Sequence, residues 1–146
     1  MKKLIAIFCF ITTLSCSDNT NINNCFRGVN ITTIIDSSLS EHNISPYNLL
    51  VPGGYSISFI EGRKILISNL GNNNYRAFDL QCPSKDCTSP MDFNGLKLIC
   101  SCGGEQYSSL SGCLINDKGE CVGSSSCSAL MYFVTYLGNS KLRISI

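Results

Sequence analysis

The segment from Cys82 to Tyr107 reads CPSKDCTSPMDFNGLKLICSCGGEQY and contains two short cysteine-bearing loops. The first loop, Cys82–Cys87, has a cysteine at each end, and the second, Cys100–Glu105, reads CSCGGE. Asn94-Gly95 lies between them and is the strongest short signal for a β-hairpin in the chain, because both residues accept the positive φ that a tight turn requires. The sequence therefore predicts a hairpin that brings the two cysteine loops side by side.

The rest of the chain has the pattern of short strands. Apolar and polar residues alternate with a period of two in several segments, and glycine, proline or asparagine bounds most of them. Turns are expected at Gly62-Arg63, as type II′, at Gly71–Asn74 and at Gly138-Asn139. No window has sustained helical spacing, so we predict an all-β chain of small antiparallel sheets. The expected extended segments are Val29–Ile35, Leu49–Val51, Tyr55–Ile60, Lys64–Ser68, Tyr75–Leu80, Met91–Phe93, Leu96–Ile99, Leu130–Leu137 and Leu142–Ile146.

The two cysteine loops resemble the cluster-binding loops of Rieske-type [2Fe–2S] domains, which read C-x-H-x-x-C and C-x-C-H-G. In that family each loop gives one cysteine and one histidine to the cluster, and the other two cysteines form a disulfide. The resemblance implies that Cys82 and Cys100 correspond to the iron-ligating cysteines and that Cys87 and Cys102 correspond to the disulfide pair. Gly104 matches the glycine after the second histidine. The implied fold is a Rieske-like stack of small antiparallel sheets with both loops at one end.

The histidines of the family pattern are replaced. Ser84 stands at the first histidine position and Gly103 at the second, and the sole histidine, His42, lies 40 residues before Cys82. A lone histidine in a loop is usually a surface side chain. Because a Rieske centre depends on imidazole ligands at one iron, the sequence argues against the usual two-cysteine, two-histidine cluster.

Four thiols remain in the two loops, at Cys82, Cys87, Cys100 and Cys102. They are the ligands for an all-cysteine [2Fe–2S] cluster or for zinc, but neighbouring thiols in an exported protein more often form disulfides. Following the resemblance, we expect the bond Cys87–Cys102. We also expect Cys82 to bond to Cys100, because the family brings these two cysteines to one iron and both histidine ligands are absent. No cofactor is favoured, and the alternative is a [2Fe–2S] cluster on these four cysteines.

The N-terminus indicates export. Lys2 and Lys3 give a charged start, and Leu4–Thr13 is an apolar run too short to span a bilayer. Leu14-Ser15-Cys16 resembles a bacterial lipobox, with Cys16 as the lipidated residue, although Thr13 stands where that pattern prefers leucine. The alternative is an ordinary signal peptide followed by an unmodified cysteine.

These features predict three parts: a signal peptide at residues 1–15, a lipidated cysteine with a polar tether at 16–28, and a Rieske-like domain at 29–146. We expect the mature chain on the bacterial cell envelope, held to a membrane by acyl chains on Cys16. Loss of Lys2 and Lys3 leaves nine basic and ten acidic residues, a net charge of −1. This charge gives no indication of nucleic-acid binding.

The chain has ten cysteines, which is too many for a reducing compartment unless they hold metal. Cys9 would leave with the signal peptide and Cys16 would carry lipid, so an even number remains for disulfides. Cys113 and Cys121 flank a turn. Either of them, or Cys127, is a candidate partner for Cys25, and the sequence leaves this pairing open.

The sequence contains no Ser–His–carboxylate set, phosphate-binding glycine loop or paired-carboxylate motif, so we do not expect an enzyme. The leading hypothesis is a clusterless, disulfide-locked Rieske-like lipoprotein that acts as a binding or structural module, with its protein partner open. The alternative is an electron-transfer protein with a [2Fe–2S] cluster on cysteines. A third hypothesis is thiol–disulfide exchange at Cys100-Ser101-Cys102, although no helix N-terminus is expected there to lower a thiol pKa.

Overall fold

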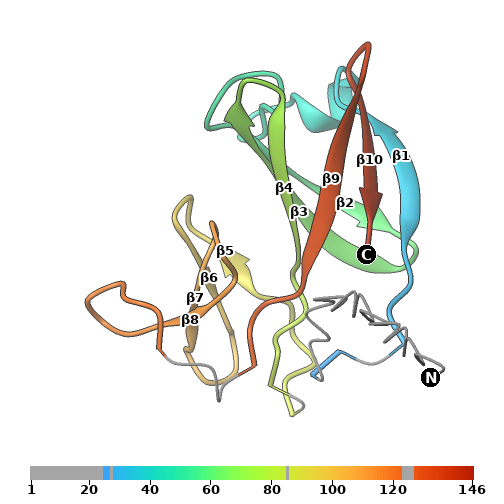
Figure 1. Cartoon of the computed structure of the whole chain (residues 1–146). Coiled ribbons are helices and arrows are strands. Elements are labelled where there is room, and N and C mark those ends of the chain that lie inside the picture. The colour runs from blue at the N-terminus through green and yellow to red at the C-terminus, as the bar shows by residue number, and fades with distance from the viewer. Residues whose placement is uncertain (1–24, 27, 85, 123–126) are drawn as a thin grey trace, which may run out of the picture.

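A computed structural model describes residues 25–26, 28–84, 86–122 and 127–146 (Figure 1). The expected signal peptide, the lipidation site Cys16 and the polar residues 17–24 lie outside the described residues. Within the described ranges the only helical element is the 3₁₀ helix η1, Ser40–His42. The prediction of an all-β chain is confirmed.

The strands form two antiparallel sheets. The six-stranded sheet has the order β1-β10-β9-β4-β3-β2, and the four-stranded sheet has the order β5-β6-β7-β8. In Figure 1 the small sheet lies beside one end of the large one. The strands are β1 (Thr32–Asp36), β2 (Tyr55–Ile60), β3 (Arg63–Gly71), β4 (Asn74–Asp79), β5 (Asp92–Phe93), β6 (Lys97–Ile99), β7 (Gln106–Ser108), β8 (Leu114–Ile115), β9 (Met131–Gly138) and β10 (Lys141–Ser145).

Three of the expected hairpin turns differ from their predicted positions. Phe93 pairs with Leu98, so the turn between β5 and β6 spans residues 94–97, with a positive φ at Gly95 but not at Asn94. Ile60 pairs with Arg63, so the turn is Glu61-Gly62, with φ of 48° and 79°. The turn between β9 and β10 is Asn139-Ser140, with φ of 48° and 60°. Positive φ at both central residues is the type I′ geometry, which matches the right-handed twist of the flanking strands. The predicted type II′ turn at Gly62-Arg63 and the predicted Gly138-Asn139 turn are therefore wrong, whereas the turn within Gly71–Asn74 is confirmed.

The middle of strand β3 is buried on both faces, because one face lines the core enclosed by its own six-stranded sheet and the other packs against the small sheet. Ile65 and Ile67 lie in a core enclosed by the six-stranded sheet, together with Leu142 and Ile144 of β10. Leu66 points the other way, into a second core with the small sheet. The continuous apolar run Ile65-Leu66-Ile67 is typical of a strand with no solvent-facing side. Cys82, Cys87 and Cys100 of the two cysteine loops also lie in this second core.

Other strand predictions need smaller corrections. The strand expected from Val29 begins at Thr32, and Leu49–Val51 forms no strand. The sequence pattern missed β7 and β8, because strands of three and two residues are too short to show alternation.

Candidate functional site

The two cysteine loops meet where the small sheet packs on the large one. The first loop follows β4, and the second joins β6 to β7, so the β5–β6 hairpin brings the loops together (Figure 1). The sulfurs of Cys82 and Cys100 are bonded, with 5.5 Å between the Cα atoms. Cys87 and Cys102 are bonded in the same way, with 5.7 Å between the Cα atoms. These are the partners that the sequence led us to expect.

The two bonds differ in their surroundings. Cys82 and Cys100 are 2% and 1% exposed and lie in the second core beside Leu98 and Tyr107. Cys87 is also buried, but Cys102 is exposed. The bond between Cys82 and Cys100 therefore lies beneath the loops, and the bond between Cys87 and Cys102 reaches the surface.

Glu105 occupies the space beside Gly103. A Cβ built on Gly103 would lie 2.7 Å from the Cδ of Glu105, so the carboxylate fills the position of a side chain at residue 103. One carboxylate oxygen of Glu105 and the sulfurs of Cys82 and Cys100 all lie within 4.8 Å of one another. This is a set of three possible ligand atoms, but two of them are joined in a covalent bond.

These residues do not fit a Rieske-type cluster. The ligand set of such a cluster includes imidazole, and the thiolates must be free. Here the sulfurs of Cys82 and Cys100 are bonded to each other, and Gly103, with the Glu105 carboxylate beside it, has no side chain to ligate iron.

His42 is buried rather than exposed. It ends η1 and is only 3% exposed, and its Nδ1 lies 2.9 Å from Ser56 Oγ and 3.3 Å from Ser58 Oγ. Its Nε2 lies 3.3 Å from Glu41 Oε1. The expectation that a lone loop histidine lies on the surface is wrong here, because the inward-facing serine hydroxyls of β2 give the imidazole hydrogen-bond partners. Its role is structural.

The later cysteines form two further bonds. Cys127 pairs with Cys25, across 102 residues, and Cys113 pairs with Cys121, across 8 residues. The structure thus resolves the pairing that the sequence left open. The turn between Cys113 and Cys121 was the only local signal available for either bond.

Sequence analysis missed a buried charged network beside the first loop. Asp79, 1% exposed, accepts hydrogen bonds from Arg63 Nε and from the Tyr132 hydroxyl, the latter at 2.7 Å. Its other oxygen accepts from the backbone N–H of Gln81 at 2.7 Å. Burial raises the pKa of Tyr132, and the hydrogen bond to Asp79 and its negative charge raise that pKa further. A buried carboxylate is stable only when it is paired and hydrogen-bonded, as it is here.

This network borders a shallow hollow of about 350 Å³ on the surface. Arg63 and Lys64 contribute cations, and the exposed ring of Phe59 lies 5.6 Å from Lys64 Nζ. Thr88 and Pro90 of the chain after the first loop form another wall. Because Arg63 is already engaged by Asp79 and Gln81, the hollow has no convergent set of free polar groups that specifies a ligand.

Burial also raises the pKa of Tyr107, and the charge of Glu105 adds to the effect. Tyr107 therefore stays protonated near the two cysteine loops at neutral pH.

Among the described residues, no helix has the length and apolar character needed to cross a bilayer.

Comparisons with known proteins give low similarities. No family model and no curated protein matches the chain. Among solved structures, a protein described as the small subunit of an NADPH nitrite reductase is 18% identical, with a TM-score of 0.38 over 65% of this chain and 88% of that one. The ferredoxin of carbazole 1,9a-dioxygenase from Nocardioides aromaticivorans IC177 is 13% identical, with a TM-score of 0.40 over 65% of this chain and 86% of that one. Neither likeness assigns a function to this chain.

Proposed function

We propose that this chain is an envelope lipoprotein whose Rieske-like domain is locked by disulfides and works as a binding or structural module without a cluster. The Rieske-like assignment rests on the loop resemblance and on the hairpin that joins the two loops. The envelope assignment rests on the N-terminal signal pattern and on Cys16, both outside the described residues.

The observation that carries the proposal is the covalent state of the loop cysteines. All four of them are in disulfides, and three are buried in the core between the sheets. Bonded sulfurs are not available as thiolate ligands, whereas two bonds across the loops fix their spacing. An oxidising compartment maintains such bonds. The loops then serve as a rigid platform rather than as a redox centre.

The second candidate is an electron-transfer protein with a [2Fe–2S] cluster on the loop cysteines. It rests on the resemblance of the two loops and on the four cysteines that the loops bring close together. It requires both loop disulfides to be open, because an all-cysteine cluster needs four thiolates.

Quantification of iron, acid-labile sulfide, zinc and free thiols in mature protein from its native compartment tests the proposal. We expect no stoichiometric metal, no labile sulfide and no free thiol. Stoichiometric iron and sulfide with the visible spectrum of a [2Fe–2S] centre would overturn the disulfide-locked module and select electron transfer. The same sample under denaturing alkylation reports directly on Cys82, Cys87, Cys100 and Cys102.

The lipid anchor has a separate test. The full-length precursor and its Cys16→Ser variant are expressed in a bacterium, and both are partitioned between detergent and water. The parent is expected in the detergent phase and the variant in the aqueous phase, because acyl chains on Cys16 supply the affinity for the membrane. A Cys16→Ser protein that partitions like the parent would contradict lipidation at this residue.

A further inference from the structure

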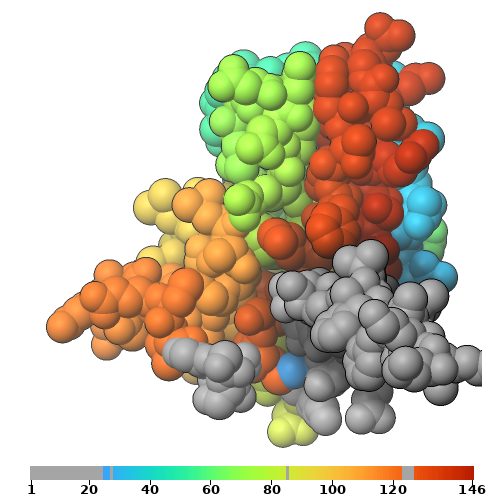
Figure 2. Space-filling model, viewed as in Figure 1, coloured from blue at the N-terminus to red at the C-terminus, as the bar shows by residue number. Residues whose placement is uncertain are grey.

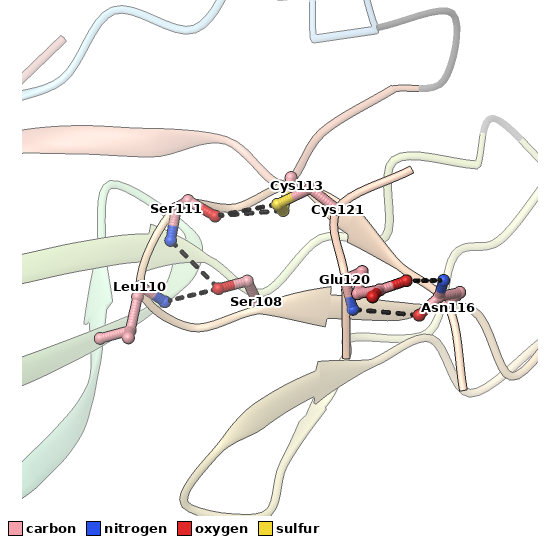
Figure 3. The surroundings of a disulfide bond; sticks show 7 residues. All are labelled: Ser108, Leu110, Ser111, Cys113, Asn116, Glu120 and Cys121. Carbon is pink, nitrogen blue, oxygen red and sulfur yellow. Dashed lines mark hydrogen bonds between the residues drawn. A yellow bond between two sulfur atoms is a disulfide. The ribbon is translucent and has the colours of Figure 1, made fainter. Parts of the chain in front are cut away.

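The bond between Cys113 and Cys121 lies beside β8, the edge strand of the small sheet (Figure 3). It closes a hairpin that contains β8 and a tight turn, with Asn116 Oδ1 accepting from the backbone N–H of Glu120 at 3.0 Å. The two Cα atoms are 5.7 Å apart. The proposed function gives this bond no role.

The two sulfur-bearing residues differ in access and in anchoring. Cys121 is exposed, and Cys113 is half-buried. Cys113 follows Gly112, whose backbone donates to Ser108 and accepts from Ala129, so this side of the bond is held by the sheet. An external thiol therefore reaches the sulfur of Cys121 more easily than the sulfur of Cys113.

A hydroxyl group is aimed at this disulfide. Ser111 Oγ lies 3.1 Å from Cys113 Sγ, to which it donates, and 3.8 Å from Cys121 Sγ (Figure 3). The Ser111 backbone N–H donates to Ser108 Oγ at 3.3 Å, which holds the residue in place. A hydrogen bond to sulfur favours the thiolate over the thiol and makes it a better leaving group.

Glu120 directly precedes Cys121, but its carboxylate accepts from Asn116 Nδ2 at 3.1 Å and points away from the disulfide (Figure 3). The asymmetry of the bond therefore rests on exposure and on the Ser111 hydroxyl. Cys121, which is exposed, is the better site of attack, and Cys113, which accepts from Ser111, is the better leaving group.

The other disulfide with an exposed cysteine lacks this arrangement. Attack on the exposed Cys102 would release Cys87, which is 2% exposed and whose sulfur lies 3.6 Å from the backbone oxygen of Ser89. A carbonyl oxygen destabilises a thiolate, and burial does so too. Both bonds have one exposed cysteine, so exposure does not distinguish them. They differ in the group that faces the leaving sulfur, which is the Ser111 hydroxyl at Cys113 and a backbone carbonyl oxygen at Cys87.

We propose that the Cys113–Cys121 bond is a thiol–disulfide exchange site for small thiols. The thiolate of the small molecule attacks Cys121 Sγ, a new S–S bond forms between them, and the Cys113–Cys121 bond breaks. The electron pair of the broken bond stays on Cys113 as a thiolate, which accepts the hydrogen bond from Ser111. Return attack by Cys113 on Cys121 releases the small thiol and restores the original bond, so the exchange leaves no net oxidation or reduction.

The test treats the oxidised mature chain with a limiting amount of cysteamine, followed by acid quenching, alkylation and mass mapping. We expect the first adduct on Cys121, with Cys113 as the alkylated free thiol. A first adduct on Cys102 or on Cys113 would overturn the proposal.

Ser111→Ala tests the role of the hydroxyl, with Ser109→Ala as the matched control, since the Ser109 hydroxyl donates to the Leu96 backbone oxygen instead. Loss of one hydrogen bond to the leaving group is expected to slow adduct formation about two- to tenfold. Ser111→Thr is expected to restore the rate. The fraction of adduct on Cys121 should also fall in Ser111→Ala, which a purely structural role of Ser111 would not produce. Equal rates and equal adduct ratios in Ser111→Ala and Ser109→Ala would refute the assignment.

Discussion

Removal of the bond between Cys25 and Cys127 should cost more stability than removal of any other disulfide of this domain. This bond joins residues 102 positions apart, whereas the Cys113–Cys121 bond joins residues 8 apart. In the chain-entropy model a disulfide stabilises the folded state by restricting the unfolded chain, and this stabilisation grows with the logarithm of the separation. The free energy lost on removing the bond is then about 4.7 kcal/mol for the long loop and about 2.5 kcal/mol for the short one. Because small domains are stable by only about 5–15 kcal/mol, the first loss brings the domain close to unfolding.

The measurement compares two double variants, Cys25→Ser with Cys127→Ser and Cys113→Ser with Cys121→Ser, in guanidinium unfolding of oxidised protein. The free energy of unfolding is expected to differ between them by about 2 kcal/mol. The denaturant slope m should also rise more in the first variant, because its unfolded chain is released from the larger loop and exposes more surface. Equal losses of stability, or a larger loss in the Cys113 and Cys121 variant, would refute the reasoning.

Three further changes test the buried polar groups and a strained backbone position. Tyr132→Phe removes the hydroxyl that donates to the buried Asp79 carboxylate and should lower the free energy of unfolding in urea by about 1–2 kcal/mol. Because folding raises the pKa of Tyr132, the stability that this group contributes to the parent is complete below about pH 10 and declines above it. The variant should lack that decline. An unchanged alkaline profile in the variant would count against this role. His42→Leu leaves the fully buried Ser56 hydroxyl without its imidazole partner and should cost about 1–3 kcal/mol in the same assay, whereas a neutral result would show that other groups satisfy Ser56. Gly112→Ala places a Cβ 2.9 Å from the Ala129 backbone oxygen at a φ of 74°. The control is Gly138→Ala, where φ is 88° but no atom lies within 4 Å of the new Cβ, so Gly112→Ala should have the lower melting temperature. Equal melting temperatures would exclude the contact with Ala129 as a cause of destabilisation.

Sequence patterns predicted the elements whose signals are local. The Asn94-Gly95 hairpin and the run Ile65-Leu66-Ile67 each depend on neighbouring residues, and the structure has both as strand pairs. The Glu61-Gly62 turn was misplaced by one residue because a glycine suits either central position of a two-residue turn. The Asn139-Ser140 turn was misplaced because Asn139, and not Gly138, takes the first central position, so composition alone does not fix the register. Partners in three dimensions are not local: Cys127 is 102 residues from Cys25, and no residue between them marks the bond.

The same limit explains why Asp79 and His42 were missed. A polar residue in a loop or at the end of a strand ordinarily faces water, but His42 and Asp79 are buried because residues distant in the sequence supply their partners. The hydroxyl that reaches Asp79 comes from 53 positions later in the chain, on β9. Whether a charged side chain is buried therefore depends on which strands lie next to each other in the sheet, and the alternation of apolar and polar residues does not reveal that order.

The loop residue Gly103 illustrates a further step that the structure adds to the sequence. From the sequence, Gly103 is only the absence of an imidazole. In the structure the space beside it holds the Glu105 carboxylate, whose oxygen lies within 4.8 Å of the sulfurs of Cys82 and Cys100. A negative charge at that distance disfavours a thiolate on either cysteine, and a poorer leaving group slows opening of the bond by external thiols. The carboxylate that fills the space beside Gly103 therefore makes the bond between Cys82 and Cys100 harder to open.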